Sequence, residues 1–250
     1  MQSVTYRFYI AILLVFLKTG PALAGPPLLT DDTSTPGDKH WEINTSFSLD
    51  KRRTESTYET PLLDLNYGIG DNIQIKYEVP WLIRHEQGAG TQSGLGNSVV
   101  GVKWRFLDQE QYGVNMSVYP QFEFNPPTSS ADRGLVDEGT NLLLPVQVSR
   151  KFGPVWVNSE LGYMLRQHHD DEWVYGISSG YEIREDLTLL GELHGESTKN
   201  FNTNEILFNV GSQWNFTKNL GLLAAAGSTL SSNVSDKLDL RLFLGMQLRL

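Results

Sequence analysis

The last thirteen residues of the chain alternate strictly between two kinds of side chain. The aliphatic ones occupy every second position: Leu238, Leu240, Leu242, Leu244, Met246, Leu248 and Leu250. Because the side chains of a β-strand point alternately to opposite faces, one face of this strand is aliphatic and the other mostly polar. No stretch of the sequence supplies a second apolar layer to cover the aliphatic face. Lipid is therefore the better partner, and such a C-terminal strand is typical of a bacterial outer-membrane barrel.

The N-terminus reads as a secretory signal peptide. One basic residue, Arg7, precedes an apolar run over residues 8–17, and Ala22-Leu23-Ala24 forms a small-residue cleavage site. The apolar run is too short to cross a bilayer as a helix. We expect residues 1–24 to be removed, residues 25–38 to form an irregular lead-in or plug, and residues 39–250 to form the barrel.

Charge and cysteine content exclude several classes of function. The formal net charge is −9, and removing residues 1–24 would take away Arg7 and Lys18 but no acid, so nucleic acid is an unsuitable partner. The chain has no cysteine, which excludes disulfides and thiolate chemistry. We expect no cofactor and no metal.

Two-residue periodicity continues from Trp41 to the end and predicts an all-β, antiparallel, up-and-down transmembrane barrel. It gives about twelve strands, near the roughly 9–11 residues that a tilted membrane strand needs. Their expected ranges are 41–49, 63–69, 73–81, 100–106, 114–124, 142–148, 155–165, 173–183, 187–193, 206–216, 220–228 and 238–250. Pro120 and Pro145 fall inside these ranges, where we expect bulges.

The connections alternate in length, as in barrels that place short turns in the periplasm and longer loops outside. Short turns are expected at residues 70–72, 108–111, 151–154, 185–186 and 217–219, and the most evident loops at residues 84–97 and 125–139. Aromatic residues gather at both predicted ends of the strands, which is the arrangement of interfacial girdles.

Whether a residue occupies an odd or an even position in its alternating strand, here called its parity, predicts which charged side chains point into the lumen. They are Glu42, Asp64, Lys76, Glu78, Lys103, Arg105, Glu123, Glu160, Arg166, Glu182, Arg184, Glu192, His194, Asp239, Arg241 and Arg249. Both signs are present, so these groups either prop the lumen as an ion-pair network or line a polar conduit. About twelve strands lies between filled small barrels and the 16–18-stranded porins, so we expect a narrow or plugged pore.

The irregular lead-in is the candidate plug. We hypothesise that residues 26–38 fold back into the barrel, with Asp31 and Asp32 pairing lumen arginines such as Arg105 or Arg249. A disordered leader is the alternative.

Three further patterns suggest chemistry more weakly. Glu192, His194 and Glu196 share one inward face, and residues 168–172 carry metal-ligand side chains, but an ion-pair row and a solvated acidic loop explain them. Residues 176–180 match G-x-S-x-G by letter, yet they lie mid-strand, whereas that motif needs a strand–turn–helix elbow.

Three stretches carry a resemblance to a known family. They are residues 26–32 (PPLLTDD) followed by His40-Trp41-Glu42, residues 67–74 (YGIGDNIQ) running to Val79-Pro80-Trp81, and residues 94–97 (GLGN) leading into residues 101–104 (GVKW). They make the chain similar to the outer-membrane barrel family named after the meta-pathway of phenol degradation. The resemblance covers the first third of the chain, and implies a monomeric barrel associated with the passage of small, often aromatic, compounds.

The sequence thus favours a narrow passive channel for small solutes, with aromatic or hydrophobic compounds among the candidates. Its expected partners are outer-membrane lipid, a small-molecule solute and, through the C-terminal strand, the barrel-assembly machinery. The rivals are a phospholipase-like outer-membrane enzyme, which would need an activated serine beside a histidine, and a structural barrel that does not conduct.

Overall fold

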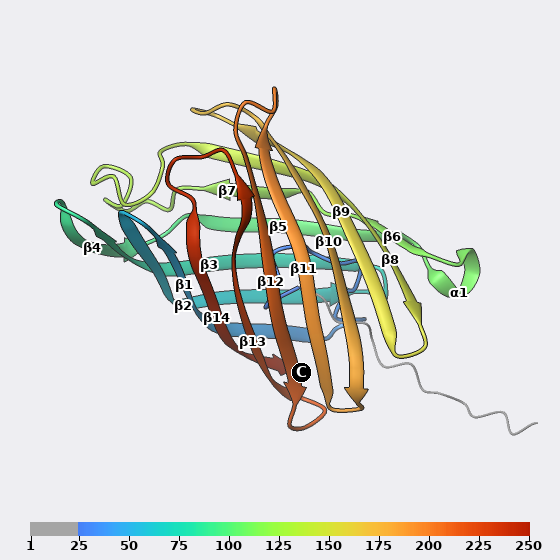
Figure 1. Cartoon of the computed structure of the whole chain (residues 1–250). Helices are drawn as coiled ribbons and strands as arrows, with labels where there is room; N and C mark the ends of the chain where they lie inside the picture. Colours follow the sequence, from blue (N-terminus) through green and yellow to red (C-terminus); the bar gives the residue numbers. More distant parts are fainter. Residues whose placement is uncertain (1–24) are drawn as a thin grey trace, which may run out of the picture.

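The computed structural model describes residues 25–250, and the predicted signal peptide lies outside these residues. The described residues form fourteen strands and one short helix (Figure 1). The strands are β1 (Trp41–Arg52), β2 (Glu55–Ile69), β3 (Ile73–Glu86), β4 (Gly90–Leu95), β5 (Ser98–Leu107), β6 (Asn115–Val118), β7 (Gln121–Phe124), β8 (Thr140–Phe152), β9 (Val155–Arg166), β10 (Glu172–Arg184), β11 (Leu187–Thr198), β12 (Asn204–Asn215), β13 (Leu220–Ser232) and β14 (Leu238–Arg249); helix α1 spans Gln109–Tyr112.

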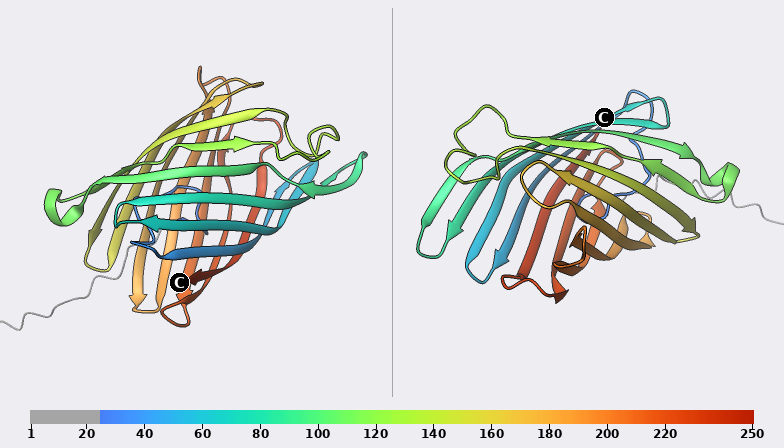
Figure 2. Two further views of the ribbon diagram at one scale, coloured as in Figure 1. Left: turned by 180° about the vertical axis from the view of Figure 1, so that it is seen from behind. Right: turned by 90° about the horizontal axis from the view of Figure 1, so that it is seen from above.

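These strands close into an antiparallel barrel whose wall has twelve strand positions, as predicted. Each position, whether filled by one long strand or by two short ones in line, is here called a stave. β1 pairs with β14, so the first and last strands close the sheet. β4 and β5 pair with successive parts of β3 and form one stave, and β6 and β7 pair with successive parts of β8 and form another. Figure 2 shows the wall from behind and from above. Closure leaves no free edge along the sheet, which an open sheet of this length would expose.

The two ends of the barrel differ in their connections. One end, here the turn end, carries the tight turns after β2, β8, β10 and β12, together with α1 and the two chain ends of the barrel, Trp41 and Leu250. The opposite end, the loop end, carries residues 125–139, 167–171, 199–203 and 233–237. The predicted loop at residues 84–97 is wrong, because β3 and β4 extend into it and leave only a short turn at residues 87–89.

The two strand prolines lie near one another across the β6/β7 stave. β6 pairs with β8 as far as Val118 opposite Val146, and β7 resumes with Gln121 opposite Leu143. Pro120 thus sits in the interruption between β6 and β7. Pro145 remains in continuous register with β9, so the bulge expected there is wrong. Pro145 has no N–H to donate, but the sheet loses no backbone hydrogen bond there, because the neighbouring strand is interrupted between β6 and β7 at this position.

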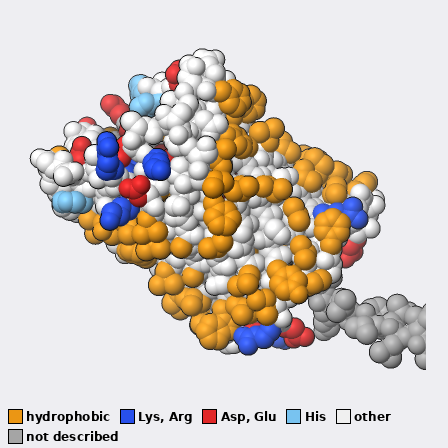
Figure 3. Space-filling model, viewed as in Figure 1, with side chains coloured by type: hydrophobic (Ala, Val, Ile, Leu, Met, Phe, Trp, Pro, Cys, Tyr) orange, Lys and Arg blue, Asp and Glu red, His pale blue; other side chains and the backbone are white. Residues whose placement is uncertain are grey.

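The barrel is polar inside and apolar outside, the reverse of a soluble domain. Outward side chains such as Leu161 are more than half exposed, whereas inward polar ones such as Gln147 are fully buried. Figure 3 shows hydrophobic side chains across the outer surface of the wall, with the charged groups in view gathered at its ends. No helix among residues 25–250 is long and apolar enough to cross a bilayer.

Aromatic rings gather near the ends of the staves. At the turn end, Trp214 and Phe216 lie 4.6 Å apart between ring centroids, and exposed Trp41 lies 4.8 Å from the ring of Tyr67. At the loop end, Tyr163 and Trp173 also lie 4.8 Å apart. Amphipathic rings at both ends of an apolar band are typical of the two interfaces of a membrane.

Candidate functional site

The lumen holds most of the charged side chains that parity assigned to it. Five are buried there: Asp64, Lys103, Glu160, Glu192 and His194. Nine more are partly covered: Glu42, Lys76, Glu78, Arg105, Glu123, Arg166, Glu182, Arg241 and Arg249. Arg184 and Asp239 are exposed, and each lies at a register shift near the end of its strand. Parity gives the face of a strand but not the depth along it.

Residues 25–38, here the N-terminal segment, run through the inside of this wall. In Figure 1 the blue segment lies behind β10 and β11. Its backbone is held by Glu192 on β11, whose carboxylate accepts hydrogen bonds from the Leu29 N–H at 2.9 Å and the Thr30 N–H at 2.8 Å. Asn209 on β12 donates to the same carboxylate at 2.6 Å. One buried charge on the wall thus fixes two consecutive amides of the segment.

A buried lysine holds the acidic part of the segment. Lys103 Nζ on β5 lies 2.8 Å from Asp31 Oδ1 and 3.3 Å from Asp32 Oδ1. The predicted arginine partners are therefore wrong. Arg105 donates instead to the Asp71 carbonyl in the β2–β3 turn, and Arg249 lies by Glu42 at 3.9 Å. Both arginines lie nearer the turn end, so only the lysine is at the depth of the two aspartates.

Apolar and hydroxyl contacts complete the seat of the segment. Leu28 packs in a buried cluster with Trp156 on β9 and Leu190 on β11. Thr33 hydrogen-bonds Ser149 on β8 at 2.5 Å through their hydroxyls. The segment therefore contacts strands on several sides of the barrel, and burial of its leucine adds to the polar contacts.

Two glycines of the wall leave room for bulky neighbours inside. A Cβ at Gly176 on β10 would lie 2.0 Å from Thr30 Oγ1, and a Cβ at Gly180 would lie 2.3 Å from the Trp156 ring. These are the two glycines of the G-x-S-x-G match. The two glycines of the match therefore allow close packing, Gly176 against the N-terminal segment and Gly180 against the Trp156 ring. They lie on a continuous strand, without the elbow that the catalytic motif needs.

The segment leaves the lumen at the turn end. Thr35 Oγ1 donates to the Asp71 carbonyl at 2.7 Å, and the Gly70 N–H donates to Asp38 Oδ1 at 2.9 Å. A Cβ at Gly68 would lie 1.8 Å from the Gly37 carbonyl oxygen, so the exit needs a glycine there. The β2–β3 turn thereby clamps the end of the segment just before β1 begins.

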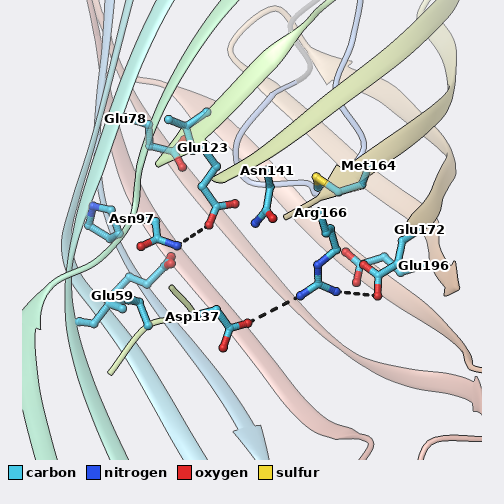
Figure 4. A pocket seen from close by; sticks show the side chains of 14 residues that line it. Glu59, Glu78, Asn97, Glu123, Asp137, Asn141, Met164, Arg166, Glu172 and Glu196 are labelled. Atoms are coloured by element: carbon cyan, nitrogen blue, oxygen red, sulfur yellow. Dashed lines mark hydrogen bonds and ion pairs between the residues drawn. The ribbon is translucent and has the colours of Figure 1, made fainter. Parts of the chain in front are cut away.

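On the loop-end side of the segment the lumen contains two adjoining cavities. The mouth chamber, of about 450 Å³, is lined by acids from several staves and by one arginine (Figure 4). Its charged residues are Glu59, Glu78, Glu123, Asp137, Glu172, Glu196 and Arg166. Arg166 binds Glu172 at 2.8 Å and Asp137 at 3.6 Å, and Asn97 donates to Glu123 at 2.6 Å.

The middle chamber, of about 310 Å³, lies deeper and is floored by the N-terminal segment. It shares Glu59, Glu78, Met164 and Glu196 with the mouth chamber, so the two spaces adjoin. Next to Asp31, Asp32 and Lys103 the remaining space is only about 30 Å³, little more than one or two water-sized spheres. The lumen is therefore open from the loop end down to the segment and narrow beyond it.

The loop of residues 125–139 covers part of the mouth. Ser130 and Leu135 are buried, and a Cβ at Gly94 on β4 would lie within 3.1 Å of both. Arg84 donates to the Gly134 carbonyl at 3.0 Å. Parity gave no sign of this cover, because it depends on a loop that has no period.

Other lumen residues were outside the reach of a search for charges. Uncharged polar side chains form much of the buried lining, including Asn44, Asn66, Gln74, Gln147, Asn158, Asn209, Gln213 and Gln247. They occupy the polar face of the same alternating strands, and this pattern could have identified them.

The weaker patterns of the sequence have structural explanations. Glu192 holds the segment, His194 Nδ1 lies 3.3 Å from Thr30 Oγ1, and Glu196 is largely exposed to the chambers. In residues 168–172, the His169 side chain lies 3.3 Å from Asp137, which belongs to a different loop. Across residues 25–250 no group of histidines and acids is arranged to hold a metal ion.

Comparisons with known proteins identify the architecture. No family model matches the chain, and no curated protein matches it in sequence. Among solved structures, an outer membrane channel from Pseudomonas putida F1 is similar, with a TM-score of 0.72 at 12% identity over 88% of this chain and 98% of that one. The KdgM porin has a TM-score of 0.56 at 13% identity over 82% and 98%. The CymD monoaromatic hydrocarbon channel has a TM-score of 0.50 at 8% identity over 85% and 89%. At these identities the likeness shows that the chain has the fold of an outer-membrane β-barrel.

Proposed function

We propose that this protein is a passive channel of the bacterial outer membrane for small solutes. The apolar outer face, with aromatic rings near both ends of the strands, fits the hydrocarbon core and the two interfaces of a bilayer. The turn end, with its short connections, faces the periplasm, and the loop end faces outward. Outer-membrane lipid is then the partner of the wall, and β14 is the strand through which the barrel-assembly machinery takes up the chain.

The observation that carries this proposal is the pair of adjoining chambers. A solute entering from the loop end meets about 450 Å³ and then about 310 Å³ of space before it reaches the N-terminal segment. A structural barrel would have no use for such space, because side chains fill the interior of small barrels. Passage beyond the segment requires that the segment move, so the segment is the gate.

Deleting residues 26–38 tests the gate. We expect single-channel conductance in a planar bilayer to rise, because the contacts of Lys103 and Glu192 then hold no segment across the lumen. Unchanged conductance in a deletion variant that still migrates as a folded, heat-modifiable barrel would contradict the gate. The full-length chain in the same bilayer is the control.

The class of solute follows from the resemblance and the neighbours. The family that the chain resembles is associated with small aromatic compounds, and one structural neighbour is described as a monoaromatic hydrocarbon channel. We therefore propose small aromatic or hydrophobic compounds as solutes. Liposome swelling with graded sugars and phenols measures this directly, and equal exclusion of every solute by the deletion variant would refute a channel.

The main rival, a lipid-modifying enzyme, has less support. Catalysis by such an enzyme needs a serine activated by a histidine. His85 and His194 hydrogen-bond hydroxyls, and both hydroxyls belong to threonines, Thr91 and Thr30. A phospholipid hydrolysis assay on the purified protein distinguishes the two functions.

A further inference from the structure

Apolar and acidic side chains are mixed in the wall of the middle chamber. The apolar ones include Leu62, Leu143, Met164, Val174 and Phe243 from five different strands, and the acidic ones include Glu59 on β2 and Glu160 on β9. A cavity of about 310 Å³ that offers both hydrocarbon and polar groups has the size of a site for a small organic molecule.

Glu160 is the most informative group in this chamber. It is 6% exposed and accepts one hydrogen bond, from Gln147 Nε2 to Oε2 at 2.8 Å. No lysine or arginine of the described chain lies within ion-pair distance of it. Glu59 is similar, since its contact is a hydrogen bond from the Ser48 hydroxyl at 2.8 Å.

The cations that line the same chamber are committed elsewhere. Lys76 Nζ lies 2.6 Å from Glu78 and 3.6 Å from Asp64, so it bridges two other acids. Arg241 forms a close ion pair with Asp50 at 2.7 Å. His194, which also lines the chamber, lies 3.7 Å from Glu196. None of these three groups lies within ion-pair distance of Glu160, so the chamber keeps carboxylates whose charge the protein does not balance by contact.

A charge enclosed in this way is costly unless a partner of opposite sign comes close. A ligand that brings a positive group to Glu160 would supply this partner. Its remaining part would lie against Leu143, Met164 and Phe243, where burial of hydrocarbon contributes roughly 25 cal/mol per Å². An anion of the same size would gain the apolar contact but would meet the carboxylates unfavourably.

We propose that the middle chamber is a binding site for small organic cations that have an apolar body, such as aryl- or alkylammonium ions. The ammonium lies at Glu160, Glu59 adds to the negative charge of the chamber, and the hydrocarbon lies against the apolar side chains. Because the inference names a solute class for the lumen described above, it rests on the proposed function. It adds discrimination by charge, which size and hydrophobicity alone would not give.

Isothermal titration of the full-length protein in detergent tests the site with three probes of one shape. They are phenethylammonium, the neutral 2-phenylethanol and the anionic 3-phenylpropanoate. We expect saturable binding of the ammonium, with the alcohol and the anion at least about tenfold weaker. Equal affinity for the ammonium and the alcohol would overturn the proposal.

Matched variants locate the binding. Glu160→Gln should weaken phenethylammonium binding by about tenfold and Glu59→Gln by a smaller factor, whereas the same substitution at Glu110, exposed in α1 outside the lumen, should leave it unchanged. Unaltered affinity in both lumen variants, each verified as a folded barrel by heat-modifiable migration, would overturn the proposal.

A separate measurement distinguishes this inference from the channel itself. Swelling of liposomes by small neutral sugars, measured on the variant lacking residues 26–38, reports passage and does not depend on ammonium binding. Loss of binding with swelling retained refutes the site alone, and binding without swelling refutes the channel alone.

Discussion

Replacing Gly176 with alanine should displace the N-terminal segment without altering the outer face of the wall. The new Cβ would lie 2.0 Å from Thr30 Oγ1, 2.9 Å from its Cγ2 and 3.0 Å from its Cβ. Ordinary contact requires at least 3.4 Å. Rotation of the threonine side chain cannot relieve all three contacts, so the backbone of the segment must move.

The size of the effect follows from what this movement breaks. Thr30 N–H donates to Glu192 at 2.8 Å and Leu29 N–H to the same carboxylate at 2.9 Å. A hydrogen bond to a charged group contributes about 1.5–3 kcal/mol. Losing one or both costs the seated state about 2–5 kcal/mol, which lowers the ratio of seated to displaced segment by roughly thirtyfold to four-thousandfold at about 1.4 kcal/mol per decade.

Single-channel recording is the assay, and Gly191→Ala is the matched control. Gly191 lies on the adjacent strand β11, and the nearest atom to a Cβ there is the Asn209 carbonyl oxygen at 3.9 Å. We expect Gly176→Ala to show a larger open fraction and faster liposome swelling, and Gly191→Ala to match the parent protein. Identical recordings from both variants would refute the assignment of the segment as the gate.

Two further predictions concern buried and exposed charges. Lys103→Met removes the buried cation that Asp31 and Asp32 share, and breaking a buried ion pair costs about 3–5 kcal/mol, so open-channel activity should rise. Addition of Asp31→Asn and Asp32→Asn to the same variant should lower it again. At the loop end, hydrogen bonds from the Thr54 hydroxyl and from neighbouring backbone N–H groups lower the pKa of Asp236 below its usual value of 3.8. Its contact between two loops should therefore persist above about pH 4 and be lost as the pH falls through the lowered pKa. Hydrogen exchange of the loop amides at pH 5 and pH 3 measures this, and Asp236→Asn should remove the dependence.

Most of the wall could be predicted from the sequence, because apolar and polar residues alternate along a membrane strand and so identify its outer and inner faces. The alternation that ends in Leu250 gives the closing strand, and Trp41 marks the first. The position of loops was less predictable. Residues 84–97 contain Gly88, Gly90, Gly94 and Gly96 and look like a loop, yet cross-strand pairing carries β3 and β4 through them.

The interior of the barrel was predicted less completely than its wall. The two acids Asp31 and Asp32 indicated a cation in the lumen. That this cation is Lys103 depends on its depth along β5, and no local sequence pattern gives that depth. Gly176 looked like part of a catalytic motif because its reason, contact with Thr30, joins residues that are far apart in sequence. Long-range packing of an irregular segment leaves no periodic signal.

The central claim is that the apolar outer face of the barrel is covered by lipid. Spin labels placed singly at outward Leu161 and at inward Gln147 of the protein in vesicles test it by power saturation. We predict that the label at position 161 is accessible to oxygen, which partitions into hydrocarbon, and shielded from a water-soluble nickel chelate. Free access of the nickel chelate to position 161 would contradict the claim and, with it, the channel.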